Sequence, residues 1–255
     1  MKRSFPYNLR KSHRYLGLVT GLQFLLWTLG GLYFSWSNIE EIHGDFERKP
    51  PSFFKADFSL ISPDTVIRQL AALDSVKSIQ LIDLLGQPHY QVVYFTGEQG
   101  KVAERTQLAH AATGLMRASL SREEAVAVAR SRFKGAGEVT ETAYLAAADL
   151  DGHHEYRGSP LPAWAIRMEH PSRTTVYVAA EQGTVTKFRN DKWRVFDFLW
   201  MLHTMDYQTR DHFGNLLLRL FSVLGLITIL SGLGLYFVSS PSRRKAVRAL
   251  RGNSL

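Results

Sequence analysis

Two long stretches of the chain are apolar and almost free of charge. The first, residues 15–37, has 23 residues without a formal charge, and its one strongly polar side chain is Gln23. The second, residues 216–238, contains a single charged side chain, Arg219. A helix rises about 1.5 Å per residue, so each stretch would be roughly 34 Å long and could cross a hydrocarbon core of about 30 Å. The pattern therefore predicts two transmembrane helices.

Between these stretches, short helical and strand patterns alternate. Helix-start signals occur at Ser62-Pro63, which predicts a helix over 63–73, and at Ser121 with Glu124, a capping-box pattern. The segments after each start have the composition of strands. The first series is expected at 78–84, 90–95 and 101–107, and the second at 138–146, 163–169, 174–179 and 184–188. We therefore predict an α+β domain over residues 62–190, with two tandem units that each place a helix on an antiparallel sheet.

The spacing of matching signals supports a duplication. The two helix caps, Ser62 and Ser121, are 59 residues apart, whereas two glycines in similar turns, Gly114 and Gly183, are 69 residues apart. The difference of about ten fits an insertion at 149–162, which is rich in Gly, Pro and charge and is expected to be a solvated loop. Residues 38–61 are expected to form a linker, extended around Pro50-Pro51, and residues 191–215 an amphipathic segment at the membrane interface.

The net charge of +8 is concentrated in two short tails, 1–14 and 239–255. Ten basic residues and no acidic ones lie there: Lys2, Arg3, Arg10, Lys11, Arg14, Arg243, Arg244, Lys245, Arg248 and Arg251. The remainder has 21 Lys and Arg against 23 Asp and Glu, so a basic face for nucleic acid is not expected. Basic tails beside apolar spans predict cytoplasmic termini in an inner membrane, with residues 38–215 in the periplasm.

A cleavable signal peptide is the alternative interpretation of the first apolar stretch. The stretch is longer than the 7–15 residues of a signal-peptide core, and no small-residue cleavage site follows it. A retained anchor is therefore favoured. The chain also contains no cysteine, which excludes disulfides, thiolate zinc sites and iron–sulfur clusters.

Three segments together resemble the PepSY family. Residues 177–188, YVAAEQGTVTKF, are similar to the last strands of a PepSY module, and residues 10–34 are similar to the PepSY-associated transmembrane helix. His13, Gly17 and Gly31 occupy recurring positions of that helix. The segment before the second span contains the Leu-His-Thr motif of the family as Leu202, His203 and Thr204. The end of the second span, SGLGLYFV, matches the family pattern only approximately.

The resemblance implies two kinds of function. Larger relatives with four spans are linked to iron acquisition and include membrane reductases that bind haem through histidines, whereas isolated PepSY units inhibit or chaperone secreted peptidases. With two spans, this chain has half the helices of the reductases and is not expected to be an enzyme on its own. We therefore expect a haem-binding or electron-relaying accessory of iron, siderophore or redox metabolism. The alternative is a non-enzymatic, membrane-anchored module that binds a peptide, a protease or another envelope partner. Either function implies a membrane or periplasmic partner protein, or a homodimer.

Four of the nine histidines lie beside the predicted spans, namely His13, His43, His203 and His212. Imidazole is a common axial ligand of haem iron. His203 is expected on a helix face that also carries aromatic residues at helical spacing: Trp193, Phe196, Trp200 and Tyr207. Such a face suits a porphyrin, and it equally suits a helix that lies in the lipid headgroups.

The predicted topology limits how these histidines could pair on one iron. His13 is expected at the cytoplasmic end of the first span, so it could not share an iron with His203 on the outer side. His203 and His212 would point to opposite sides of a continuous helix, and they could pair only if the chain turns at residues 206–211. Otherwise His43 or a partner chain would supply the second ligand. Arg210 and Arg219 are candidate partners for the haem propionates.

His153-His154-Glu155, beside two aspartates in the predicted insertion, could bind a metal. A solvated loop is favoured there. The sequence shows no P-loop, GxSxG, HExxH or dinucleotide-binding motif. No catalytic residue and no metal site are therefore assigned from the sequence.

Overall fold

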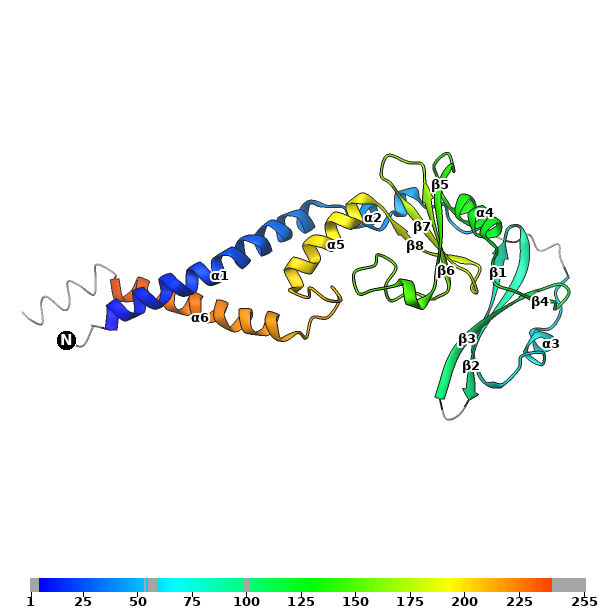
Figure 1. Cartoon of the computed structure of the whole chain (residues 1–255), viewed down its shortest axis with the longest axis horizontal. Coiled ribbons are helices and arrows are strands. Elements are labelled where there is room, and N and C mark those ends of the chain that lie inside the picture. Colours follow the sequence, from blue (N-terminus) through cyan, green and yellow to red (C-terminus); the bar gives the residue numbers. More distant parts are fainter. Residues whose placement is uncertain (1–4, 53, 55–58, 99–100, 240–255) are drawn as a thin grey trace, which may run out of the picture. The chain divides into compact units, whose positions relative to one another are not determined.

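The computed structural model describes residues 5–52, 54, 59–98 and 101–239, and the chain divides into two compact units (Figure 1). The helical unit combines Met1–Ser37 with Phe196–Leu255, and the α+β unit comprises Asn38–Val195. The helix α5, Asp191–Thr204, begins in the α+β unit and ends in the helical unit.

The helical unit contains two helices that are long and apolar enough to cross a membrane. They are α1, Phe5–Trp36, with a candidate span at Tyr7–Trp36, and α6, Leu216–Ser239, with a candidate span at Leu216–Phe237. Both predicted apolar helices are thus present, at a length and hydropathy that would allow them to cross a membrane. However, α1 begins ten residues before the predicted span, because the basic segment after Pro6 contains no helix breaker and continues the same helix.

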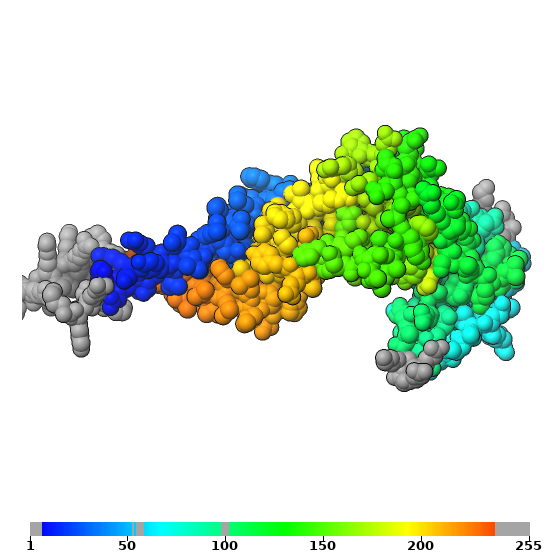
Figure 2. All heavy atoms as spheres, viewed as in Figure 1, coloured from blue at the N-terminus to red at the C-terminus, as the bar shows by residue number. Residues whose placement is uncertain are grey.

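Small residues of α6 allow it to pack closely on α1, and Figure 2 shows the atoms of the two helices side by side. A methyl group added at Gly225 would lie 2.7 Å from the Phe24 ring. The Thr20 hydroxyl lies 3.4 Å from the Thr228 hydroxyl. Close approach of this kind is how apolar helices associate in lipid.

Three glycines of α1 do not take part in a similar close contact. Methyl groups added at Gly17, Gly21 or Gly31 would meet no atom within 4 Å among the described residues. At the contact between the two helices, α1 therefore contributes Thr20 and Phe24, and α6 contributes Thr228 and Gly225.

The α+β unit contains two four-stranded antiparallel sheets with strand orders β1-β2-β3-β4 and β5-β6-β7-β8. The first sheet comprises β1 Leu73–Leu84, β2 Gln87–Glu98, β3 Lys101–His110 and β4 Met116–Arg117. The second comprises β5 Val139–Leu145, β6 Ala163–Met168, β7 Thr175–Ala179 and β8 Thr184–Arg189. The helical segments of this unit are α2 Ile39–His43, η1 Asp45–Glu47, α3 Pro63–Ile67, α4 Arg122–Arg132 and η2 Ala147–Asp149. One helix, α3 or α4, precedes each sheet, so the predicted α+β class is confirmed.

The two helix starts were predicted better than their ends. Ser121 and Glu124 form the predicted capping box at the start of α4, and Pro63 lies in the first turn of α3. The predicted helix over 63–73 is wrong at its end, because α3 stops at Ile67. Leu73 instead begins β1 and pairs with Thr96 of β2. Leu73, which suggested another helical turn, is instead the first residue of a strand.

A shared core joins the two sheets through α4. The turn between β7 and β8 comes so close to the first sheet that a methyl group added at Gly183 would lie 2.9 Å from a methyl carbon of Leu108. The buried cluster comprises Leu84, Leu108, Leu120, Ala125, Val128, Ala129, Phe133, Ile166, Met168, Val176, Val178 and Phe188. Because both sheets contribute to this cluster, the two helix-plus-sheet segments form one compact unit.

The first part of the predicted linker packs on this core. Arg48 forms an isolated bridge with Phe133, and its guanidinium lies 4.9 Å from the centre of the Phe188 ring. The backbone N–H of Lys49 donates a hydrogen bond to the carbonyl oxygen of Arg132 over 2.7 Å. Residues 45–47 form the short helix η1 and Arg48 is extended, so the first part of the predicted linker is packed on the core, while residues 53 and 55–58 lie outside the described residues.

The predicted insertion at 149–162 is not a solvated loop. Tyr156 is completely buried and stacks on Tyr177 of β7 with a ring separation of 4.6 Å. The carboxylate of Glu155 accepts hydrogen bonds from the Tyr177 hydroxyl, 2.6 Å, and from Arg194 Nε, 2.8 Å. Burial and the neighbouring Glu155 carboxylate raise the pKa of Tyr177. The insertion is thus anchored on the second sheet, because its tyrosine and glutamate find partners that are distant in the sequence.

Candidate functional site

The C-terminal half of α5 runs antiparallel along α1. The Phe196 ring lies 4.8 Å from the Phe34 ring, and further along both helices the Gln23 amide donates a hydrogen bond to the carbonyl oxygen of Leu202 over 2.9 Å. Gln23 is itself buried. The one strongly polar side chain of the first apolar stretch therefore contacts α5, and the predicted interfacial segment packs on a candidate membrane span.

His203 lies among aromatic rings from both helices. Its ring centre is 5.8 Å from that of Trp27, 5.9 Å from that of Phe34 and 6.3 Å from that of Trp200, on which it stacks. Among the described residues, neither His203 Nδ1 nor Trp27 Nε1 has a hydrogen-bond partner, although both atoms are buried. A buried polar atom without a partner is unfavourable by about 1–3 kcal/mol. The two nitrogens therefore indicate a place where a ligand or solvent would bind.

The predicted aromatic face of α5 is only partly correct. Trp193 lies in the α+β unit, where the Arg189 guanidinium is 3.9 Å from the centre of its ring. Tyr207 is exposed and lies beyond the end of α5 at Thr204. The face that meets α1 is thus shorter than predicted, with Phe196, Trp200 and His203 as its members.

A tight turn follows α5, as pairing of His203 with His212 would require. The carboxylate of Asp206 accepts hydrogen bonds from the N–H groups of Gln208, Thr209 and His212 over 3.2, 3.1 and 2.9 Å. The Thr209 hydroxyl donates another. Because the helix is broken here, His203 and His212 are not held on opposite sides of one helix. His212 is exposed after the turn.

Burial of Asp206 would raise the pKa of its carboxyl group, but its hydrogen bonds from Thr209, His212 and Gln208 outweigh this and lower that pKa. The ionised group therefore stabilises the folded turn. This contribution is fully present above the unfolded-state pKa of about 3.8 and is lost as the pH falls through the lower folded-state value.

We expect Asp206→Asn to loosen this turn by about 1–2 kcal/mol at pH 7, because the amide replaces a charged acceptor by a neutral one. Hydrogen exchange at the amides of 208, 209 and 212 should become roughly 5- to 30-fold faster, since each 1.4 kcal/mol is a factor of ten. The matched control is Glu169→Gln, which removes an exposed carboxylate elsewhere. Unchanged exchange in the Asp206 variant would contradict the assigned role of the carboxylate.

The two arginines expected to meet haem propionates have different surroundings. Arg210 forms an ion pair with Asp197 of α5, whose side chain is only 4% exposed. Arg219 lies near His212 on the other side of Gly214, since a methyl group added at Gly214 would be 3.2 Å from His212 Nε2 and 3.6 Å from an Arg219 nitrogen. The structure thus places Arg219 near a candidate ligand, while Arg210 closes the turn onto α5.

The other two predicted histidines, His13 and His43, have surroundings of their own. His13 Nδ1 is 2.8 Å from the Ser231 hydroxyl of α6. His13 precedes Trp27 by 14 residues on α1, which is roughly 21 Å along the helix axis. His43 is exposed at the end of α2, in the α+β unit. Of these histidines and His212, only His212 belongs to the turn that directly follows His203.

The two histidines of the insertion take part in hydrogen bonds of a turn. The backbone N–H of Tyr156 donates a hydrogen bond to His154 Nδ1 over 3.1 Å, and the His153 N–H donates one to Asp151 over 2.9 Å. Within the part of the chain that the structure describes, no three His, Asp or Glu side chains gather as metal ligands do. Both contacts instead shape the turn that carries Tyr156.

Sequence reasoning missed the partners of the candidate residues. Trp27 and Phe34, seven residues apart on α1, face His203, and Asp197 pairs with Arg210. Their spacing of seven was a usable signal, because it places both rings near one helix face. None of these residues stood out from the aromatic and acidic residues around it.

No family model, curated protein or solved structure matches the chain in the comparisons made with each of these sets. The resemblance to the PepSY family thus stays a hypothesis that is based on the sequence motifs.

Proposed function

We propose that the protein is a membrane-anchored accessory that binds haem through His203 and relays electrons in iron, siderophore or redox metabolism. The observation that carries the proposal is the position of His203 in the helical unit. Its imidazole is enclosed by the rings of Trp27, Phe34 and Trp200, and one buried ring nitrogen has no partner among the described residues.

The residues present fit a haem group. A neutral imidazole carries one lone pair for a metal ion, and flat aromatic rings provide apolar contacts for a porphyrin. Haem, when bound, would supply one-electron transfer. The protein's own residues would hold the imidazole, exclude water and place positive charge nearby, at Arg219 beside His212.

A second axial ligand has three candidate sources. His212 is favoured because it belongs to the same unit as His203 and follows the turn closed by Asp206. His43 and a histidine from a second copy of the chain are the other two. His13 would come next if His203 were not a ligand, and its iron would lie on the cytoplasmic side.

The family resemblance supports this proposal in two ways. His203 is the central residue of the Leu202-His203-Thr204 motif, and each sheet of the α+β unit is a four-stranded meander preceded by a helix. We propose that these two segments are PepSY-like repeats and that they lie in the periplasm. The basic tails support cytoplasmic termini.

An absorption spectrum of the full chain, purified in detergent from haem-replete cells, tests the function. We expect a reducible Soret band in the native protein. His203→Ala should abolish the band while the protein still inserts, and the matched control His153→Ala should retain it. An unaltered band in the His203 variant would remove this assignment, and no band in the native protein would favour the non-enzymatic binding module instead.

A further inference from the structure

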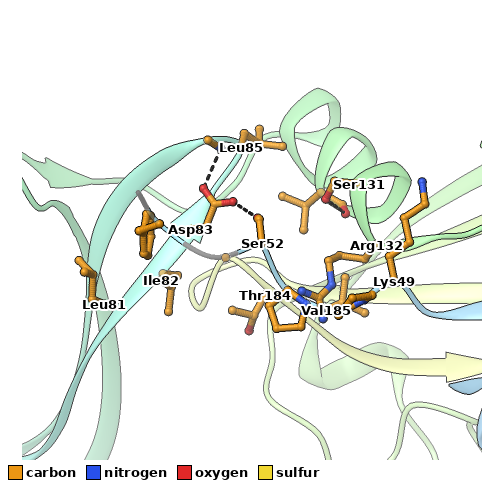
Figure 3. A pocket seen from close by; sticks show the side chains of 16 residues that line it. Lys49, Ser52, Leu81, Ile82, Asp83, Leu85, Ser131, Arg132, Thr184 and Val185 are labelled. Carbon is orange, nitrogen blue, oxygen red and sulfur yellow. Dashed lines mark hydrogen bonds between the residues drawn. The ribbon is translucent and has the colours of Figure 1, made fainter. Parts of the chain in front are cut away.

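A groove of about 1080 Å³ lies within the α+β unit, far in sequence from His203 (Figure 3). Four segments border it: residues 49–52, the end of β1, the end of α4 and the start of β8. Its wall is mostly apolar, with Pro50, Pro51, Leu81, Ile82, Leu85, Val128 and Val185. A groove of this size and lining is typical of a ligand site.

Two basic residues, Arg132 and the exposed Lys49, line one side of this groove. In Figure 3, Arg132 and Lys49 lie on the same side of it, whereas Asp83 lies on the other. Arg132 Nε is buried and has no hydrogen-bond partner among the described residues. Burial and the neighbouring Arg48 both lower the pKa of Arg132, and no carboxylate contributes to that shift. Arg132 is partly exposed, but its buried Nε has no acidic partner among the described residues, so this end of the groove is complementary to an anion.

Asp83, an acidic residue in the wall of the groove, already has hydrogen-bond partners of its own. The carboxylate of Asp83 accepts a hydrogen bond from the Ser52 hydroxyl and another from the Gly86 N–H over 2.8 Å. These bonds hold Asp83 away from Arg132, which keeps the positive end uncompensated. A bound group therefore meets opposite charges at the two sides, and these charges would fix its orientation.

Edge strands of both sheets border the groove. β1 is the first strand of its sheet and β8 is the last strand of the other, so each has one side without a neighbouring strand among the described residues. Leu81, Ile82 and Asp83 of β1 and Thr184 and Val185 of β8 lie in the groove wall. An aliphatic chain would cover the backbone N–H and C=O groups of these edges without bonding them. An extended peptide would satisfy them by adding a strand.

From these observations we infer that the groove binds an extended peptide segment, which pairs with the free edge of β1 and places an acidic side chain against Arg132 and Lys49. Apolar side chains of the peptide would pack on Leu81, Ile82 and Val128. This site is independent of haem binding at His203, because all its residues belong to the α+β unit.

The test uses the full chain in detergent and a labelled probe, a nine-residue peptide of alternating Val and Thr with one central Glu and with both ends blocked. We expect saturable binding, followed by fluorescence anisotropy. Replacing the Glu of the probe by Gln should weaken binding about tenfold, and Arg132→Gln should do the same, since a charge-assisted hydrogen bond is lost in each case. Combining the two changes should add little further loss.

Two controls separate the parts of the inference. Arg130→Gln removes an exposed guanidinium from the same helix, outside the groove, and should leave binding unchanged. Methylating the backbone nitrogens along one edge of the probe should abolish binding, whereas methylating those along the other edge should not. Equal binding of the Glu and Gln probes, or indifference to both methylations, would overturn the inference, as would failure of the Glu probe to bind. None of these outcomes depends on the Soret band.

Discussion

Replacing Tyr156 by alanine is expected to lower the free energy of unfolding of the α+β unit by about 3–5 kcal/mol. The ring is completely buried, and it stacks on Tyr177 at 4.6 Å. Its hydroxyl donates a hydrogen bond to the carbonyl oxygen of Pro160 over 2.8 Å and lies 3.1 Å from the Thr186 hydroxyl. The substitution removes these contacts together and leaves a cavity beneath the insertion. Chemical denaturation followed by circular dichroism measures the change.

Tyr156→Phe distinguishes the contribution of the ring to stability from that of the hydroxyl. It keeps the stacking on Tyr177 and removes only the polar contacts, so we expect a loss of about 1–2 kcal/mol. If alanine cost less than 1 kcal/mol, the insertion would behave as the solvated loop that its composition suggests. Equal losses in both variants would show that the hydroxyl, and not the ring, anchors the segment.

The insertion shows why part of this fold could not be predicted from the sequence. Gly, Pro and charged residues around Tyr156 are typical of a loop, and that local signal is correct, since the segment has little regular structure. The burial of Tyr156 depends on Tyr177 and Thr186, which lie in the second and third strands after it, β7 and β8. No local pattern reports a partner at that distance. By contrast, the capping box at Ser121 was predictable because its two members are only three residues apart.

The end of α3 shows a different limit of the sequence. Val66, Leu70 and Leu73 have helical spacing, and Val66 is indeed buried and Leu70 packs beside it. Leu73, however, pairs with Thr96 and belongs to β1. A short apolar pattern fits either a last helical turn or the first residue of a strand, and the neighbouring strand decides between them.

The histidine of the candidate site could be predicted from the sequence, but the aromatic rings that surround it could not. His203 stood out because of its motif and of the aromatic residues at helical spacing around it. The rings of α1 that surround it could not be identified, because they belong to the opposite end of the chain. The groove at Arg132 was wholly unpredicted. It is built from four segments, and its distinguishing property, a cation without a carboxylate partner, appears only when the chain has folded.

Replacing Asp197 by alanine is expected to destabilise the helical unit by about 3–5 kcal/mol, because it leaves the Arg210 guanidinium without its carboxylate. The side chains of Asp197 and Arg210 are only 4% and 19% exposed, so water replaces the lost partner poorly. The pair also ties the turn after α5 back onto α5, close to His203. Unfolding in mixed micelles with increasing SDS, followed by helical circular dichroism, measures the effect.

The double substitution distinguishes the ion pair from simple loss of packing. Replacing Asp197 by Ala and Arg210 by Met removes both charges, so we expect it to be less destabilising than Asp197→Ala alone, by at least about 1 kcal/mol. If the effects of the two single substitutions simply added, the two side chains would not be coupled and the pair would not help to hold the turn. A coupled result would mean that the Asp197–Arg210 pair fixes the chain between α5 and α6, in addition to the hydrogen bonds to Asp206 and those that the Asn215 amide donates to the carbonyl oxygens of Thr204 and His212. That rigidity is what a second ligand at His212 would require, because an imidazole on a loosely held loop would lose conformational entropy on binding iron.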